Sequence, residues 1–181
     1  MKRRLIAIFS IVAVAAIISV GSLAYFSVEG RTTNTVTTGK VDLEIHEVDA
    51  DGNSQADSSI EVMPGDVLDR ILTVENTAEH PMYLRVKLTK TVSGEGLDVD
   101  AAMSMDIDTA HWTEQEGYYY YNTAVAAGER TEPLFTTVSM DGKAMDNSYL
   151  GKTFTLDVNA QAVQSENNGA TVFDAAGWSA E

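Results

Sequence analysis

The chain contains no cysteine among its 181 residues, and only 12 basic residues stand against 27 acidic ones. The missing thiols exclude disulfides, thiolate zinc sites, iron–sulfur clusters and cysteine nucleophiles. The formal charge of −15 repels phosphate backbones, so nucleic-acid binding is not expected. Hydrophobic residues make up 44% of the chain and charged residues 22%, which is typical of a folded globular protein and excludes wholesale disorder.

Motifs of catalysis are also missing. The three histidines, His46, His80 and His111, form no His-Glu-x-x-His pair, which is the pattern that holds zinc in many metalloproteases. There is no Gly-x-Ser-x-Gly elbow and no glycine-rich phosphate loop. We therefore expect a protein that is not an enzyme and that has no cofactor, with calcium as the one candidate ion.

The first 24 residues have the three parts of an export signal. A positive start, Lys2 to Arg4, precedes the apolar run Leu5–Val20, and small residues at positions 22 and 24 precede a cleavage site between Ala24 and Tyr25. The alternative is an uncleaved membrane anchor, because the 22 residues Leu5–Phe26 are long enough to span a bilayer. In either case residues 25–181 lie outside the cytoplasm, and only the signal segment contacts the membrane.

Removal of the signal makes the chain more acidic. Residues 1–24 hold three of the 12 basic residues and none of the acidic ones, so 9 basic and 27 acidic residues remain, a charge of −18 over 157 residues. Charge of one sign keeps copies apart at low ionic strength. Salt, low pH or divalent cations would relieve this repulsion.

Residues 40–181 alternate between apolar and polar side chains, with a period of two that is typical of half-buried strands. Turn sequences rich in glycine, aspartate and asparagine separate the alternating segments. The pattern predicts one all-β domain, an antiparallel β-sandwich that is jelly-roll-like. The expected strands are 41–46, 60–63, 67–75, 82–89, 118–124, 134–140 and 154–162.

Three local expectations refine this fold. Residues 97–107 are expected to form a short helix in a crossover, and residues 170–178 a terminal turn or helix at one end of the sandwich or, alternatively, a frayed tail. Pro64-Gly65-Asp66 suits a type II turn, because proline fixes φ and glycine allows a positive φ. We expect the strands on either side of this turn and the Met82 strand to form a meander in one sheet.

Several motifs follow one another in a recognisable order: the signal ending Ala24-Tyr25-Phe26, then Thr-Thr-Gly-Lys-Val-Asp-Leu at 37–43, Met-Pro-Gly-Asp at 63–66, and Thr-Val-Glu-Asn-Thr at 73–77. Over about residues 1–90 this order resembles the TasA/camelysin family of biofilm matrix proteins. The resemblance implies cleavage by a dedicated ER-type signal peptidase and secretion from a Gram-positive cell to its surface or matrix. It also implies self-association into fibres, with other matrix proteins or polysaccharide as further partners. Camelysin-like proteins have been described as metalloproteases, but the zinc motif is absent here.

Residues 25–39 become the free N-terminal segment after cleavage. They are rich in threonine and have Tyr25, Phe26, Val28 and Val36 as apolar anchors, which gives them high β propensity. We predict a donor strand that adds to the sheet of a neighbouring subunit, the mode of assembly that the resemblance implies. The alternatives are a flexible leader and an ordinary edge strand.

Two further segments are candidate binding sites. Asp49, Asp51, Asn53 and Asp57 place oxygen ligands at alternate positions, as calcium loops do, although a solvated hairpin turn also explains them. A strand alternates its side chains between two faces, so two rings of the run Tyr118, Tyr119, Tyr120 and Tyr121 would face outward and two the core. The outward pair would bind glycans or a partner subunit. Alternatively, the run supplies two core aromatics, with Trp112 in the same cluster, and two cross-strand stabilisers. These sites support the alternative function, a monomeric cell-surface module that binds glycan or calcium.

Overall fold

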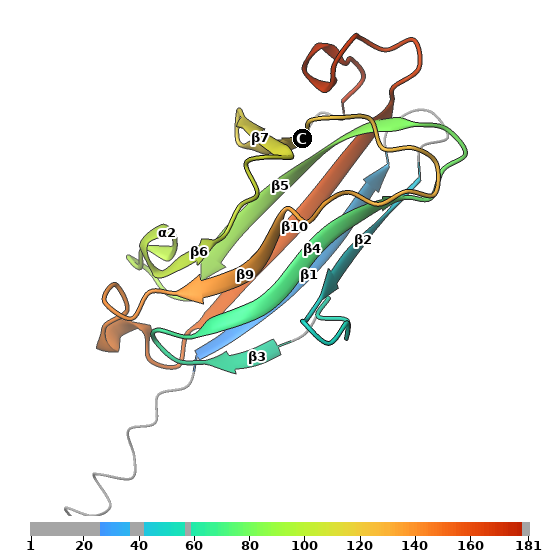
Figure 1. Cartoon of the computed structure of the whole chain (residues 1–181). Coiled ribbons are helices and arrows are strands. Elements are labelled where there is room, and N and C mark those ends of the chain that lie inside the picture. The colour runs from blue at the N-terminus through green and yellow to red at the C-terminus, as the bar shows by residue number, and fades with distance from the viewer. Residues whose placement is uncertain (1–25, 37–41, 57–58, 179–181) are drawn as a thin grey trace, which may run out of the picture.

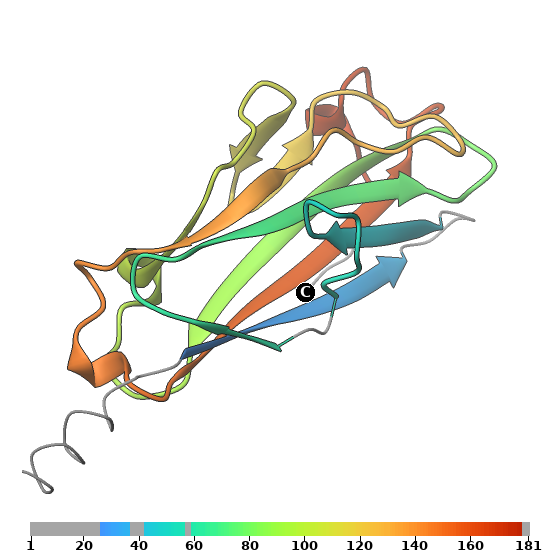
Figure 2. The same ribbon diagram turned by 60° about the horizontal axis from the view of Figure 1, so that its bottom comes forward.

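Two β-sheets form a sandwich in the computed structural model, which describes residues 26–36, 42–56 and 59–178 (Figures 1 and 2). One sheet has six strands in the order β3-β1-β10-β5-β8-β7, and the other has four in the order β2-β4-β9-β6. Consecutive strands alternate between the two sheets except for the β7–β8 hairpin, as is typical of jelly rolls. The strands are β1 (Phe26–Val36), β2 (Leu43–Val48), β3 (Ser59–Val62), β4 (Val67–Asn76), β5 (Met82–Val92), β6 (Met103–Met105), β7 (Trp112–Gln115), β8 (Tyr118–Tyr121), β9 (Phe135–Met140) and β10 (Thr153–Gln164).

The core lies between the sheets and is built from alternate residues of the long strands. On β10, for example, Phe154, Leu156 and Val158 are buried in the central cluster, while Asp157 and Asn159 on the opposite face are partly exposed. Each fully buried aliphatic or aromatic side chain contributes about 1.5–3 kcal/mol of transfer free energy. Further members of the cluster are Leu72, Val74, Leu84, Val86, Phe135 and Val138.

The predicted all-β sandwich is confirmed, with one departure in strand direction. Every strand pair is antiparallel except β1 with β10, which run parallel. The predicted meander is wrong, because β4 and β5 lie in opposite sheets. Alternation shows only that a strand has one apolar face. It does not show which of the two sheets the strand belongs to.

The short elements differ in detail from the expectation. The helix predicted within 97–107 is one turn, α2 (Val99–Ala102), which begins where the Asp98 side chain accepts a hydrogen bond from the Ala101 N–H and continues directly into β6. The 3-10 turns are η1 (Asn147–Tyr149) and η2 (Val172–Asp174). The second of these belongs to the C-terminal tail, residues 165–178, which packs against the sandwich up to Trp178 instead of fraying.

The two ends of the sandwich bring different strands together. At the Phe26 end, Phe26 is the register partner of Val62, and Ser27 is that of Thr153. At the Val36 end, Val36 is the partner of Ala162, and β2 starts at Leu43 opposite Asn76. β1 therefore runs the length of the molecule, and β2 starts at the end where β1 finishes.

Candidate functional site

Strand β1 lies inside the six-stranded sheet, between β3 and β10 (Figure 1). Residues 27–36 pair in parallel with residues 153–162 of β10, and Phe26–Glu29 pair in antiparallel fashion with β3. The short strand β3 is joined to the rest of its sheet only through β1. Removal of β1 would therefore leave the whole length of β10 with an open edge and β3 without a neighbour. The expectation of an ordinary edge strand is wrong for Phe26–Glu29, which pair on both sides. In the described part of the chain residues 30–36 pair with β10 alone, as an edge strand does. Tyr25 and residues 37–39 lie outside the described residues.

The sequence of β1 is less apolar than the other long strands. The five inward-facing residues of β10 have Val28, Gly30, Thr32, Asn34 and Val36 as their register partners on β1. On the other side of β10, the partners of Val158, Ala160 and Ala162 are Leu88, Val86 and Leu84. Two valines among five positions are a small apolar content for a long strand. We therefore expect main-chain hydrogen bonds to supply much of the free energy of its pairing.

The Pro64 turn shapes the Phe26 end beside β1. Gly65 has φ +94°, Asp66 accepts a hydrogen bond from the Met63 N–H at 2.7 Å, and its own N–H donates to the Met63 carbonyl, as predicted for this turn. Within the described residues four large hydrophobic side chains are exposed, and three of them, Met63 (47%), Val67 (62%) and Leu150 (46%), lie around this end. The Phe26 end therefore carries most of the exposed large hydrophobic side chains of the described residues.

The Thr-Val-Glu-Asn-Thr motif has a structural explanation at the opposite, Val36 end. Asn76 is fully buried, its amide donates to the carbonyls of His80 and Val125 at 2.9 Å each, and its side-chain oxygen accepts from the Ala78 N–H. These bonds satisfy a buried polar side chain and fix the connection from β4 to β5. Asn76 of this motif therefore stabilises the fold at the Val36 end.

A buried ion pair lies between the sheets, and sequence reasoning missed it. Arg70 on β4 and Glu47 on β2 have no exposed surface, and their Nε and Oε1 atoms are 2.7 Å apart. The Arg70 Nη2 also donates to the Gln55 carbonyl at 2.9 Å, while within the described part of the chain its Nη1 has no hydrogen-bond partner. The signal was present in the sequence, because each residue interrupts the apolar face of its strand and the two charges are opposite. Strand β2 lies against β1 of the other sheet, so the pair is close to the position that β1 fills.

The candidate calcium loop is closed by its own hydrogen bonds. The Asp49 carboxylate accepts the N–H groups of Asp51 and Asn53, the Asn53 amide and the Gln55 amide at 2.8–3.1 Å. The hydrogen bonds from Asn53 lower the pKa of Asp49 below its usual value. Asp57 lies outside the described residues, and no group of three or more metal-ligating side chains occurs within them. The geometry fits the alternative interpretation, a solvated hairpin turn, and calcium binding by the loop stays a question for experiment.

The four tyrosines lie on β8, but their outward pair is covered. Tyr119 and Tyr121 pack against the main core, where the ring of Tyr121 is 5.0 Å from that of Trp112, as expected. Tyr118 and Tyr120 are on the other face and are 8% and 6% exposed, because the C-terminal tail lies over them. The expected exposed pair is therefore absent. Sequence alternation predicts which face a ring takes, but it does not predict that a segment 50 residues away returns to cover that face.

Arg85 is at the centre of this second cluster. Its guanidinium lies 3.8 Å from the centroid of the Tyr118 ring and 4.7 Å from that of Trp178, and it donates to the Gln161 side chain and the Tyr120 hydroxyl. Cation–π contacts of this kind stabilise by about 0.5–2 kcal/mol. The cluster attaches the tail to the outer face of the six-stranded sheet.

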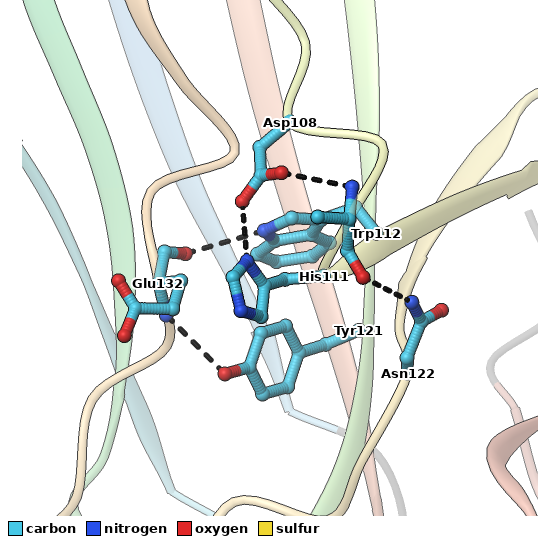
Figure 3. A network of polar contacts seen from close by, with 7 residues as sticks. Asp108, His111, Trp112, Tyr121, Asn122 and Glu132 are labelled. Atoms are coloured by element: carbon cyan, nitrogen blue, oxygen red, sulfur yellow. Dashed lines mark hydrogen bonds and ion pairs between the residues drawn. The ribbon is translucent and has the colours of Figure 1, made fainter.

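A polar network joins the β6–β7 connection to the β8–β9 connection (Figure 3). The Asp108 carboxylate is 2.6 Å from Nδ1 of His111, the Trp112 indole donates to the Glu132 carbonyl, and the Asn122 N–H donates to the His111 carbonyl. The hydrogen bond with His111 lowers the pKa of Asp108. The network fixes the indole in the core and orders two loops, and its geometry is that of a structural element.

Within the described residues no helix is long and apolar enough to cross a membrane, and the predicted signal with its Ala24–Tyr25 cleavage site lies outside them. No family model, curated protein or solved structure matches the chain.

Proposed function

We propose that the chain is an exported structural subunit, which assembles into extracellular filaments when its β1 strand enters the sheet of another copy. The observation that carries this proposal is the position of β1. It is the first strand of the chain, it pairs over ten residues with the last strand, β10, and its other side pairs with β3 over Phe26–Glu29. Residues 37–42 alone join it to the rest of the domain. A segment that begins at a free N-terminus and is attached at one end can leave without unthreading any other part of the fold.

The exchange costs little at equilibrium, because main-chain hydrogen bonds that break in one copy are replaced by main-chain hydrogen bonds in the next. The strand can pair with β10 and β3 whether it comes from the same chain or from another. An exchange in which each copy gives its strand to the next one is heterologous and need not close, so it yields filaments.

The acidic surface sets the conditions of assembly. The charge of −18 on residues 25–181 opposes the approach of a second copy. We expect slow assembly at low salt, and faster assembly at high salt or near pH 4–5, where carboxylates begin to take up protons. The uncleaved precursor is not expected to assemble, because its strand is held by the signal segment.

The test compares the mature chain, residues 25–181, with a truncation that starts at Gly39, by light scattering and electron microscopy. The full chain should form filaments and the truncation should not. Val36→Pro should also reduce assembly, because proline removes a main-chain donor, with Val36→Ala as the matched control. If the truncation unfolds, a synthetic peptide of residues 25–38 added to it should restore its melting temperature. Filaments from the truncation equal to those of the full chain would contradict the proposal.

A further inference from the structure

The direction of β1 limits the way in which two copies can exchange it. In the single chain β1 is parallel to β10 and ends at the Val36 end, where β2 also starts. Six residues, 37–42, separate Val36 from Leu43. A fully extended chain over these seven steps spans at most about 25 Å. β10 has 12 residues and is about 36–40 Å long. The connection therefore cannot reach from one end of a subunit to the other.

This limit has a consequence for the shape of the assembly. If the donated strand kept its parallel direction, its last residue would lie at the acceptor's Val36 end, and the donor's own Val36 end would have to lie within about 25 Å of it. The two bodies would then meet Val36 end to Val36 end or lie side by side. If the strand were reversed, its last residue would lie at the acceptor's Phe26 end, and the subunits would follow one another end to end.

Two properties of the surface favour the end-to-end arrangement. Side-by-side packing brings the long faces of two bodies together, each body with a charge of −18, whereas end-to-end packing keeps most of that charge apart. In addition, Met63, Val67 and Leu150 expose apolar surface around the Phe26 end, and in this arrangement the donor's Val36 end would cover it. Burial of exposed apolar side chains at a contact between copies is favourable.

The sequence of β1 fits the sheet in either direction. Its alternate residues from position 28 to 36 are Val, Gly, Thr, Asn and Val, with a valine at each end, small residues between them and Thr32 at the centre. In the parallel register Thr32 is the partner of Val158. Reversal about this centre would place Val28 opposite Ala162 and Val36 opposite Phe154. The positions beside Phe154 and Ala162 of β10 would therefore still be occupied by a valine.

We propose that β1 reverses its direction when it enters a second copy and pairs antiparallel with the acceptor's β10, which makes the filament end to end. This inference rests on the proposed function and adds the orientation of the exchanged strand. Antiparallel pairing is slightly more stable per residue than parallel pairing, so reversal along β10 supplies a driving force that an exchange of identical contacts lacks. The gain along ten residue pairs on β10 outweighs the opposite change along the four pairs with β3.

The missing cysteines make a direct test possible, because any engineered disulfide is the only one present. Two variants of residues 25–181 share Thr155→Cys. In Glu29→Cys/Thr155→Cys the two positions are partners in the parallel register. In Thr35→Cys/Thr155→Cys they become partners only in the reversed register about Thr32. Both proteins are assembled under reducing conditions, oxidised as filaments and run on denaturing gels without reductant.

If the exchanged strand is reversed, we expect a ladder of covalent oligomers from the Thr35/Thr155 variant and single chains from the Glu29/Thr155 variant. A ladder from the Glu29/Thr155 variant, with or without one from the other, overturns the reversal but keeps strand exchange. Filaments that give no ladder with either variant overturn both the reversal and the proposed function.

Discussion

Replacement of one partner of the buried Glu47–Arg70 pair should destabilise the domain strongly. Both side chains are completely buried, and their Nε and Oε1 atoms are 2.7 Å apart. When one charge of such a pair is removed, the other stays in a medium of low dielectric constant without compensation, at a typical cost of about 3–5 kcal/mol. This is a large part of the roughly 5–15 kcal/mol by which domains are usually stable. We therefore expect Glu47→Gln and Arg70→Met each to lower the melting temperature by about 6–20 °C.

The double variant separates the cost of burial from the gain of pairing. Glu47→Leu/Arg70→Met removes both charges and fills the space with apolar groups, so its free energy of unfolding should be close to that of the unchanged protein or above it. Urea denaturation of residues 25–181, followed by circular dichroism, measures all three variants. Each single variant should lose at least about 3 kcal/mol. A loss below about 1 kcal/mol, within the usual range for exposed pairs, would refute the burial of the pair.

Three surface features give further predictions. Hydrogen bonds lower the pKa of several carboxyls, including Asp49, Asp108, Asp141 and Asp146. Because their pKa values are lower in the folded protein than in the unfolded chain, these groups stabilise the fold above about pH 4, and this stabilisation is lost as the pH falls through the folded values. Urea denaturation should therefore show a free energy of unfolding that falls steadily below about pH 4. Trp178→Ala removes the ring over Arg85 and should cost about 1–2 kcal/mol and open residues 165–178 to proteolysis, whereas Phe173→Ala, at an exposed position, should change both less. Millimolar calcium should leave the melting temperature unchanged, because the Asp49 oxygens already accept four N–H groups; a rise that Asp51→Ala abolishes would show instead that the loop binds calcium.

The predictable part of the fold is the part that depends on local pattern. The alternation from Met82 to Thr89 and from Phe154 to Ala162 predicts β5 and β10, and Pro64-Gly65 predicts the turn, because a strand's period and a glycine's positive φ are properties of a few neighbouring residues. The pairing of β1 with β10 links residues more than 100 positions apart in sequence, and no local pattern indicates it. The same holds for the tail that covers Tyr118 and Tyr120.

Positions of charge are the least predictable part of the candidate site. Alternation places Arg70 on the same strand face as Leu72 and Val74, and it lies there, but alternation alone does not show that this face is fully buried or that Glu47 is within reach. A charged residue that interrupts an apolar face in each of two strands, with opposite signs, is the signal that would have found the pair. The threonine content of residues 25–39 and their place after the predicted signal lead to the donor-strand prediction, but these features do not indicate that residues 26–36 pair within their own sheet.

The most direct test of the account is whether β1 must leave its own sheet before filaments form. In Glu29→Cys/Thr155→Cys, oxidation of the dilute monomer should join β1 to its own β10, where the two positions are register partners. The matched control is Thr91→Cys/Thr155→Cys, which joins β5 to β10 and leaves β1 unbound. We predict that the oxidised first variant scatters no more light than the unassembled monomer and forms filaments only after reduction. The oxidised control should form filaments throughout. Filaments from the first variant while its disulfide is intact would contradict the account.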